Sequence, residues 1–243
     1  MAGDDTEEGL EIIEVSGVKI PIDPEIMSPK IIEILRQGDG YDHGRAKLAP
    51  RLIEPGERVL DLGAGLGFIS AIVARQGKAS LVAAVEADPC VIPLIRAVHR
   101  LNGLDCVIRN AAVVAARTAD TIPFYVHKDL WASSLMPLPE ESLKRVDQVP
   151  VATFAELFSD YAPTLLMLDF EVLRELVPNL KSPETDVMDD IDFRPVPKIL
   201  LMLKQKVLGL RGVKRAFDVL SGQGFAYDPA FSQGNNVLMR RVE

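Results

Sequence analysis

The chain has 243 residues, of which 48% are hydrophobic and 26% charged, and its net charge is -8 with a pI near 5.0. These values are typical of a globular chain with one large or two small domains. The acidic balance argues against a nucleic-acid partner and against anionic membranes. No apolar run is long enough to span a bilayer, and the acidic residues 1–9 lack the apolar core of a signal peptide, so the cytoplasm is the expected location. Cys90 and Cys106 form no CxxC pair, and we expect no metal site.

Residues 1–44 are expected to form an acidic tail, a hairpin and a helix that pack on a core domain of residues 45–243. Ser16-Gly17 separates two short apolar runs, which is a hairpin signal. Ser28-Pro29 is typical of a helix start, with the serine as cap and the proline at the first helical position. A glycine-rich loop follows at residues 38–44, so this extension leads directly into the core domain.

A glycine-rich turn begins the core domain. Residues 58–70 read as a buried strand, a turn and the start of a helix, with the spacing D-x-G-x-G-x-G from Asp61 to Gly67. A dinucleotide site needs G-x-G-x-x-G, and Phe68 stands where the last glycine of that pattern would be. The stretch therefore resembles the first motif of class I S-adenosylmethionine-dependent methyltransferases. The resemblance implies that Gly63 and Gly65 pass close to the methionine part of the cofactor, with Asp61 at or near that end.

Strands and helices alternate through the rest of the chain, which predicts an α/β fold with helices on both faces of a parallel sheet. We expect a three-layer α-β-α sandwich around a Rossmann-like, seven-stranded, mostly parallel sheet, with the hairpin and helix as an N-terminal extension. Two insertions are expected, at about 113–150 and 179–197. The core strands are expected at 58–62, 80–86, 106–109, 164–169, 199–203, 225–227 and 236–240, and further helices at 45–53, 68–76, 89–101, 153–158, 171–178 and 211–221.

Two strand ends carry polar side chains that suit a nucleoside. Glu86 ends the second core strand, about 20 residues after the glycines, where an acidic residue usually binds ribose hydroxyls. Asn110 ends the third strand, which in this fold class commonly faces the adenine, although an asparagine in a plain turn fits equally well. The expected cofactor-binding residues are Asp42, Asp61, Gly63, Ala64, Gly65, Gly67, Phe68, Glu86, Ala87, Asn110, Ala111 and Asp169.

The end of the fourth strand is the best candidate for the acceptor site. Asp169 and Glu171 lie at the carboxyl edge of the sheet, where chemistry in such folds takes place, and we expect them to orient the acceptor or act as a base. Trp131, next to Ser133-Ser134, is expected to line an acceptor pocket or to pack in the core. The aspartates between 186 and 192 are expected to form a solvated acidic face in an exposed insertion.

The ordered motifs resemble the FkbM family of methyltransferases. The resemblance rests on Gly40-Tyr41-Asp42, on the run from Pro55 to Gly67, on Asn110-Ala111-Ala112-Val113 and on the segment 149–157. It implies O-methylation of a small-molecule hydroxyl with S-adenosylmethionine. From the acidic charge we expect no nucleic acid or membrane partner, and a homodimer is possible. After Asp169 and Glu171 the chain departs from the family, with Val172 and Leu173 in place of glycine and alanine. Alternatives are therefore a protein or RNA methyltransferase of the same fold, or a cofactor-binding protein that has lost catalysis.

Overall fold

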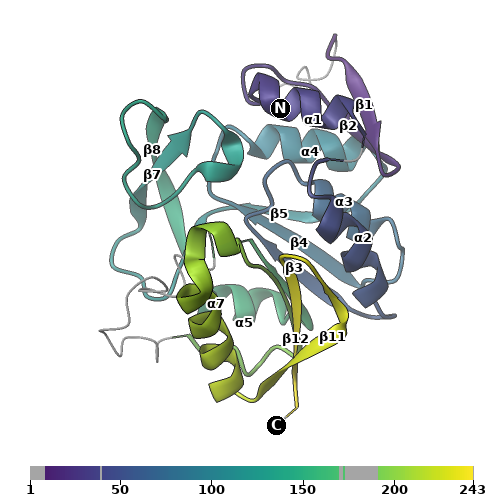
Figure 1. The fold of residues 1–243 in the computed structure, drawn as a ribbon. Coiled ribbons are helices and arrows are strands. Elements are labelled where there is room, and N and C mark those ends of the chain that lie inside the picture. Colours follow the sequence, from purple (N-terminus) through teal and green to yellow (C-terminus); the bar gives the residue numbers. More distant parts are fainter. Residues whose placement is uncertain (1–8, 39, 170–171, 173–190, 243) are drawn as a thin grey trace.

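The computed structural model describes residues 9–38, 40–169, 172 and 191–242 (Figure 1). The N-terminal part comprises β1 (Ile12–Val15), β2 (Val18–Pro21), α1 (Pro29–Arg36) and α2 (His43–Leu52). The middle comprises β3 (Arg58–Leu62), α3 (Phe68–Ala74), β4 (Leu81–Glu86), α4 (Ile92–Leu101), β5 (Val107–Asn110), β6 (Ala112–Val114), β7 (Thr121–His127), the 3₁₀ turn η1 (Leu130–Ala132), β8 (Leu143–Thr153) and α5 (Phe154–Tyr161). The last part comprises β9 (Leu165–Leu168), β10 (Lys198–Met202), α7 (Gln205–Gly222), β11 (Phe225–Gln233) and β12 (Asn236–Arg241).

The central sheet has seven strands in the order β11-β12-β10-β9-β3-β4-β5. From β10 to β5 all neighbours are parallel, whereas β12 runs antiparallel to both β10 and β11. This arrangement confirms the predicted mostly parallel sheet with a final antiparallel pair. Because β3, β4, β5 and β9 are parallel, their carboxyl ends meet at one edge of the sheet.

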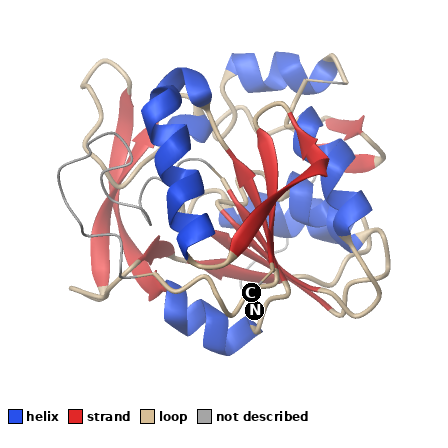
Figure 2. Ribbon diagram, turned by 60° about the horizontal axis from the view of Figure 1, so that its bottom comes forward, coloured by secondary structure: helices blue, strands red, loops and turns tan. Residues whose placement is uncertain are grey.

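Helices cover both faces of the sheet, which makes three layers (Figure 2). Side chains alternate along β3, so Val59 packs with α2, α3 and α4 on one face, while Leu60 and Leu62 pack with α5 and α7 on the other. The strands buried on both faces are apolar almost throughout, as expected of a parallel sheet covered on both sides. The alternation also decides the position of Asp61, which faces the α2 side.

The N-terminal hairpin and α1 pack against the same face of the sheet as α3 and α4, within one hydrophobic cluster. Ser28 caps α1 by accepting a hydrogen bond from the backbone N–H of Ile31, and Pro29 is its first residue. The side chain of Asn102, just after α4, holds the hairpin by pairing with both backbone groups of Lys19. The predicted hairpin and helix cap are therefore confirmed.

The first predicted insertion forms a small sheet of its own. β8 pairs with β7 in an antiparallel hairpin and with β6 in parallel, and the hairpin projects to one side of the main sheet (Figure 1). η1 lies between β7 and β8, close to α1, because the Ser28 hydroxyl donates to the carboxylate of Asp129, the residue before this turn. The insertion thus places Leu130 and Trp131 near the central sheet.

The second insertion differs from its prediction where the structure describes it. Ile191, Phe193 and Val196 are buried against α5 and α7, although residues 182–195 were expected to be exposed. The Gln223 side chain fixes this segment by pairing with the backbone of Ile191 and Phe193. The predicted helix at 171–178 lies outside the described residues except for Val172, and so do the aspartates at 186, 189 and 190. Among the described helices none is long and apolar enough to cross a membrane.

Candidate active site

A cleft of about 880 Å³, counting space open to solvent, lies at the edge where β3, β4, β5 and β9 end. Its size is in the range of pockets that hold small molecules and cofactors. One side is formed by the glycine turn after β3, and another by residues of η1 and the β7–β8 hairpin. The lining residues are Tyr41, Asp42, Arg45, Gly63, Ala64, Gly65, Phe68, Ile69, Val85, Glu86, Ala87, Ala111, Ala112, Val113, Phe124, Leu130, Trp131, Ser133, Ser134, Leu135, Asp169 and Val172.

The turn between β3 and α3 requires glycine for conformation and for space. Gly63, Gly65 and Gly67 have φ values of 79°, 55° and 72°, which side chains rarely adopt. A Cβ on Gly63 would come within 3.0 Å of a Val172 methyl, and one on Gly65 within 3.4 Å of the Tyr41 hydroxyl oxygen. The backbone therefore lines the cleft without side chains. Because α3 begins at Phe68, the free N–H groups of its first turn lie directly after this loop.

Glu86 joins the end of β4 to the glycine turn. One carboxylate oxygen accepts from the Gly65 N–H at 2.8 Å, and the other accepts from the Asp88 N–H at 3.0 Å. Burial raises the pKa of Glu86 to about 7, and these backbone donors reduce the rise. A carboxylate held in this way lines the cleft and could accept hydrogen bonds from the hydroxyls of a sugar.

Arg45 sits at the centre of a buried group of charges. Its guanidinium pairs with Asp42 and lies 3.5 Å from a carboxylate oxygen of Asp169, although α2 and β9 are far apart in sequence. Burial opposes the charge, but the two carboxylates outweigh it and raise the pKa of Arg45. The Nη1 atom is buried and has no hydrogen-bond partner within the described residues. An orphaned guanidinium nitrogen in a cleft is suited to a carboxylate of a ligand.

Asp61 lies beneath the cleft and only 1% of it is exposed. Neither carboxylate oxygen has a hydrogen-bond partner in the part of the chain that the structure describes. Burial raises the pKa of Asp61 to about 7, against the opposing effect of the Arg45 charge, while Asp42 and Asp169 raise it further. With Asp42, Asp169 and Asp61 around a single Arg45, the acids outnumber the cation, and a cationic ligand would balance the group.

The opposite wall of the cleft is apolar. Ala111 and Ala112 follow β5, and Phe124, Leu130 and Leu135 come from the insertion. An apolar wall of this kind suits an aromatic base. At its rim the Trp131 ring also faces the Lys30 ammonium, 5.1 Å from the ring centroid.

The structure brings most of the predicted cofactor residues together: nine of the twelve line the cleft. Asp61, Gly67 and Asn110 do not. Asp61 faces α2 below the cleft, Gly67 packs against Ile95 of α4, and the Asn110 amide donates to the backbone oxygens of Glu86 and Ala87. Their roles, like those of the nine, remain predictions. Of the two predicted catalytic residues, Asp169 lines the cleft and Glu171 lies outside the described residues.

Several lining residues were not predicted from the sequence. Arg45 was assigned only to a helix, yet its i,i+3 spacing from Asp42 at the start of α2 is a signal for an ion pair. Tyr41 was noted only in a motif, although its ring packs edge-on against Phe68 with centroids 5.7 Å apart. Trp131 was expected to line an acceptor pocket or to pack in the core, and it lines the cleft, as do Ser133 and Ser134, for which no such role was predicted.

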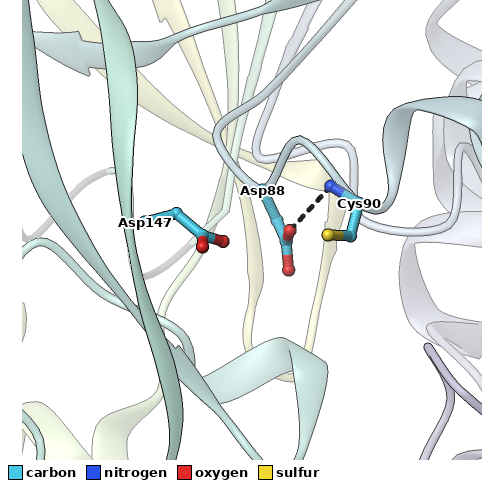
Figure 3. Close-up of side chains that lie close together, drawn as sticks. All are labelled: Asp88, Cys90 and Asp147. Carbon is cyan, nitrogen blue, oxygen red and sulfur yellow. Dashed lines mark hydrogen bonds between the residues drawn. The ribbon is translucent and has the colours of Figure 1, made fainter.

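A separate cluster consists of Asp88 and Cys90, which precede α4, and Asp147 of β8 (Figure 3). Its possible ligand atoms all lie within 4.8 Å of one another, which is compatible with a metal. However, Arg145 forms ion pairs with both Asp88 and Asp147, and Asp88 also accepts from the Cys90 N–H. These ion pairs explain the cluster as an internal contact between the segment before α4 and the β7–β8 hairpin.

The strand order, the glycine turn and the acidic end of β4 are those of the class I S-adenosylmethionine-dependent methyltransferases. Residues 38–127, less than half of the chain, match the model of the TRM5/TYW2 methyltransferase domain. The matched region includes Asp42, Arg45, the glycine turn and Glu86. The chain is thus an S-adenosylmethionine-dependent methyltransferase, and the predicted enzyme class, cofactor and fold are confirmed.

Solved structures similar to the chain share its fold at low sequence identity. The Pyrococcus abyssi tRNA (uracil-54, C5)-methyltransferase in complex with S-adenosyl-L-homocysteine is 12% identical, with a TM-score of 0.47, and the match covers 95% of this chain but 43% of that one. TYW2 from M. jannaschii in complex with AdoMet is 13% identical, with a TM-score of 0.48 and coverage of 100% and 90%. Trm5b from Pyrococcus abyssi is 13% identical, with a TM-score of 0.42 and coverage of 98% and 56%. A comparison with curated proteins gave no significant match.

These comparisons correct three expectations. The resemblance to the FkbM family was wrong, because the family match is to the TRM5/TYW2 domain; the motifs behind it mostly build a cofactor cleft common to the whole class. The prediction of small-molecule O-methylation came from that resemblance and is overturned with it. The expected absence of a nucleic-acid partner was also wrong, because net charge is a property of the whole chain and phosphate binding needs only a local positive surface.

Proposed function

We propose that the protein transfers a methyl group from S-adenosylmethionine to an RNA of the transfer-RNA class. The observation that carries this proposal is the TRM5/TYW2 match over residues 38–127, since that family consists of tRNA methyltransferases and the match spans the glycine turn and Glu86. The methyltransferase domain proper is proposed to be residues 45–243, with residues 1–44 as an extension. The cytoplasmic location also remains a proposal.

The cleft supports a definite placement of the cofactor. In this placement the glycine turn at Gly63–Gly65 holds the methionine part, the Glu86 carboxylate accepts from the ribose hydroxyls, and Ala111 and Phe124 contact the adenine. The orphaned Nη1 of Arg45 would donate a hydrogen bond to the carboxylate of the methionine part. The sulfonium and the ammonium of the cofactor are positive, which suits the excess of acids around Arg45.

The bound cofactor supplies an electrophilic methyl group, and the residues of the chain do the rest. Asp169 lies at the carboxyl end of β9 beside the glycine turn, with its Cβ 3.1 Å from where a Cβ of Gly63 would be. It is placed to hold the acceptor in line and to take up the acceptor's proton if one is released. Arg45 fixes the Asp169 carboxylate, so it acts on the acceptor through Asp169.

Methyl transfer to RNA can be tested with S-adenosylmethionine carrying a labelled methyl group. The full chain is incubated with unmodified tRNA transcripts, ribosomal RNA, a protein extract or a metabolite extract, and label is counted in each fraction. The proposal predicts nuclease-sensitive label in tRNA. Label confined to protein or metabolites would contradict it.

The Gly65→Val variant is the matched control, because a β-branched side chain at φ 55° beside the Tyr41 hydroxyl obstructs the cleft. Label in tRNA should disappear with this variant. If the wild-type protein binds S-adenosylmethionine but labels no fraction, the alternative of a cofactor-binding protein without catalysis replaces the proposal.

A further inference from the structure

One stretch of the described chain carries several lysines and arginines and no acidic residue. Residues 198–217 contain six lysines and arginines and no aspartate or glutamate, in a chain whose net charge is -8. They form β10 and most of α7. Lys198 forms a buried ion pair with Glu57, so the exposed positive charge of this stretch lies on α7 and directly before it.

The start of α7 lies near the edge of the sheet that carries Asp169. Because Leu201 of β10 pairs with Leu168 of β9, Met202 is opposite Asp169 on the neighbouring strand, roughly 5 Å away. α7 begins three residues later, at Gln205, so its first turn starts within about 10 Å of the sheet edge that carries Asp169. In Figure 1 this end of α7 points toward the middle of the molecule, beside the edge where the parallel strands end.

Four side chains make this end of the helix an exposed surface, which we call the basic strip: Lys206, Val207, Leu210 and Arg211. All four are exposed, and Leu210 is 72% exposed. The α7 helix is interrupted at Gly209, whose φ of 66° and ψ of 174° are not helical, so the first turn departs from the axis of the rest.

The charges of the basic strip are not used within the described part of the protein. Neither Lys206 nor Arg211 forms an ion pair with another described residue, whereas Lys214, further along the same helix, pairs with Asp218. Lysine and arginine side chains without internal partners are suited to the phosphates of a nucleic acid. The exposed Val207 and Leu210 between them offer apolar contact to sugars or bases.

We infer that the basic strip docks the phosphate backbone of the RNA substrate and guides the target nucleotide toward Asp169. This inference rests on the proposed function, because it names a surface through which that function would act. It also resolves how an acidic protein can bind RNA: charge complementarity is local, beside the cleft, and the acidic remainder limits non-specific binding. A protein partner on the same surface is the competing occupant.

The test is a double charge reversal, Lys206→Glu with Arg211→Glu, in the full chain. The matched control is Arg75→Glu with Lys78→Glu, which makes the same change in net charge, also at an exposed arginine and lysine. Lys78 precedes β4, so the control lies toward the opposite edge of the sheet. Binding of an end-labelled, unmodified tRNA transcript is measured by filter binding at several salt concentrations, and S-adenosylmethionine binding is followed by calorimetry to show that each variant is folded.

We expect the strip variant to bind the transcript at least 10-fold more weakly and to lower the salt slope of log K by about 2, one unit for each lost phosphate contact. Its affinity for S-adenosylmethionine should stay within twofold of wild type, and the control variant should match wild type in both assays. The inference is overturned if the strip variant binds the transcript as wild type does, which is the outcome expected of a protein-docking surface, or if both variants lose affinity equally. If the wild-type protein neither binds nor methylates RNA, the proposed function is wrong as well. If the strip variant binds and methylates RNA as the wild-type protein does, only this inference is wrong.

Discussion

Replacing Asp61 with asparagine should make the free protein more stable and its cofactor binding weaker. Asp61 is 1% exposed, neither of its oxygens has a hydrogen-bond partner among the described residues, and burial raises its pKa from 3.8 to about 7. A carboxyl group whose pKa is higher in the folded than in the unfolded protein stabilises the fold most at a pH below the unfolded-state pKa. The contribution of Asp61 to the free energy of unfolding is therefore lost as the pH rises from about 4 through 7.

The size of the effect follows from the shift. About three pKa units correspond to roughly 4 kcal/mol by which ionised Asp61 lowers the free energy of unfolding at pH 8. The asparagine amide keeps the volume but remains poorly hydrogen-bonded, which costs about 1–3 kcal/mol. The Asp61→Asn variant should therefore be more stable than wild type by about 1–3 kcal/mol at pH 8, or about 2–4 °C in Tm for each kcal/mol.

Urea unfolding at pH 8 and at pH 5 measures this directly. At pH 5 Asp61 is protonated, so the advantage of the variant should disappear. S-adenosylmethionine binding should be at least 10-fold weaker in the variant at pH 8, because the cationic cofactor loses one of three neighbouring carboxylates. A variant that is less stable than wild type at pH 8 would refute the reasoning, since it would mean that ionised Asp61 is well solvated or paired.

Three further changes probe other parts of the molecule. Gly65→Val should weaken S-adenosylmethionine binding at least 100-fold. It should also lower the free energy of unfolding by about 1–2 kcal/mol, because the backbone at this position has a left-handed φ. Unchanged binding in calorimetry would place the cofactor elsewhere. Glu86→Gln should weaken S-adenosylmethionine binding about 10-fold or more. In the wild-type protein the affinity should rise between pH 6 and 8, because the raised pKa of Glu86 leaves it partly protonated in the free protein, and the variant should lack this rise. A pH dependence that persists in the variant would point to another group. Lys198→Met should lower the free energy of unfolding by about 3–5 kcal/mol, because it leaves the Glu57 carboxylate, 2.5 Å from the lysine amine, buried without its cation. Adding Glu57→Gln should recover part of that loss, and no recovery would argue against a coupled pair.

Most of the fold could be predicted because its signals are local. The apolar run of β4, the Ser28-Pro29 cap and the glycine turn each specify their element without help from distant residues. The prediction was weaker where packing against distant elements decides the conformation. Ile191 and Phe193 are buried because they pack against α5 and because Gln223 bonds to their segment. The aspartates and prolines around them make the alternation of apolar and polar residues hard to recognise in the sequence.

The cofactor side of the cleft was predicted better than the acceptor side for a related reason. The glycines follow β3 and Glu86 ends the neighbouring strand β4, so the distance between them in the sequence indicates that they lie close together. Arg45 meets Asp169 only because α2 packs over the end of β9, 124 residues away, and no local pattern indicates this contact. The substrate class was wrong because it followed from the FkbM resemblance, and because net charge averages over the chain and does not report local charge.

Calorimetric titration of the full chain with S-adenosylmethionine, S-adenosylhomocysteine and NAD tests the central claim most directly. The cleft predicts that both sulfur compounds bind at one site and that Gly65→Val abolishes both. S-adenosylmethionine should bind more tightly because its sulfonium adds a positive charge near Asp42, Asp61 and Asp169. Failure of both sulfur compounds to bind, or binding of NAD in their place, would contradict the account.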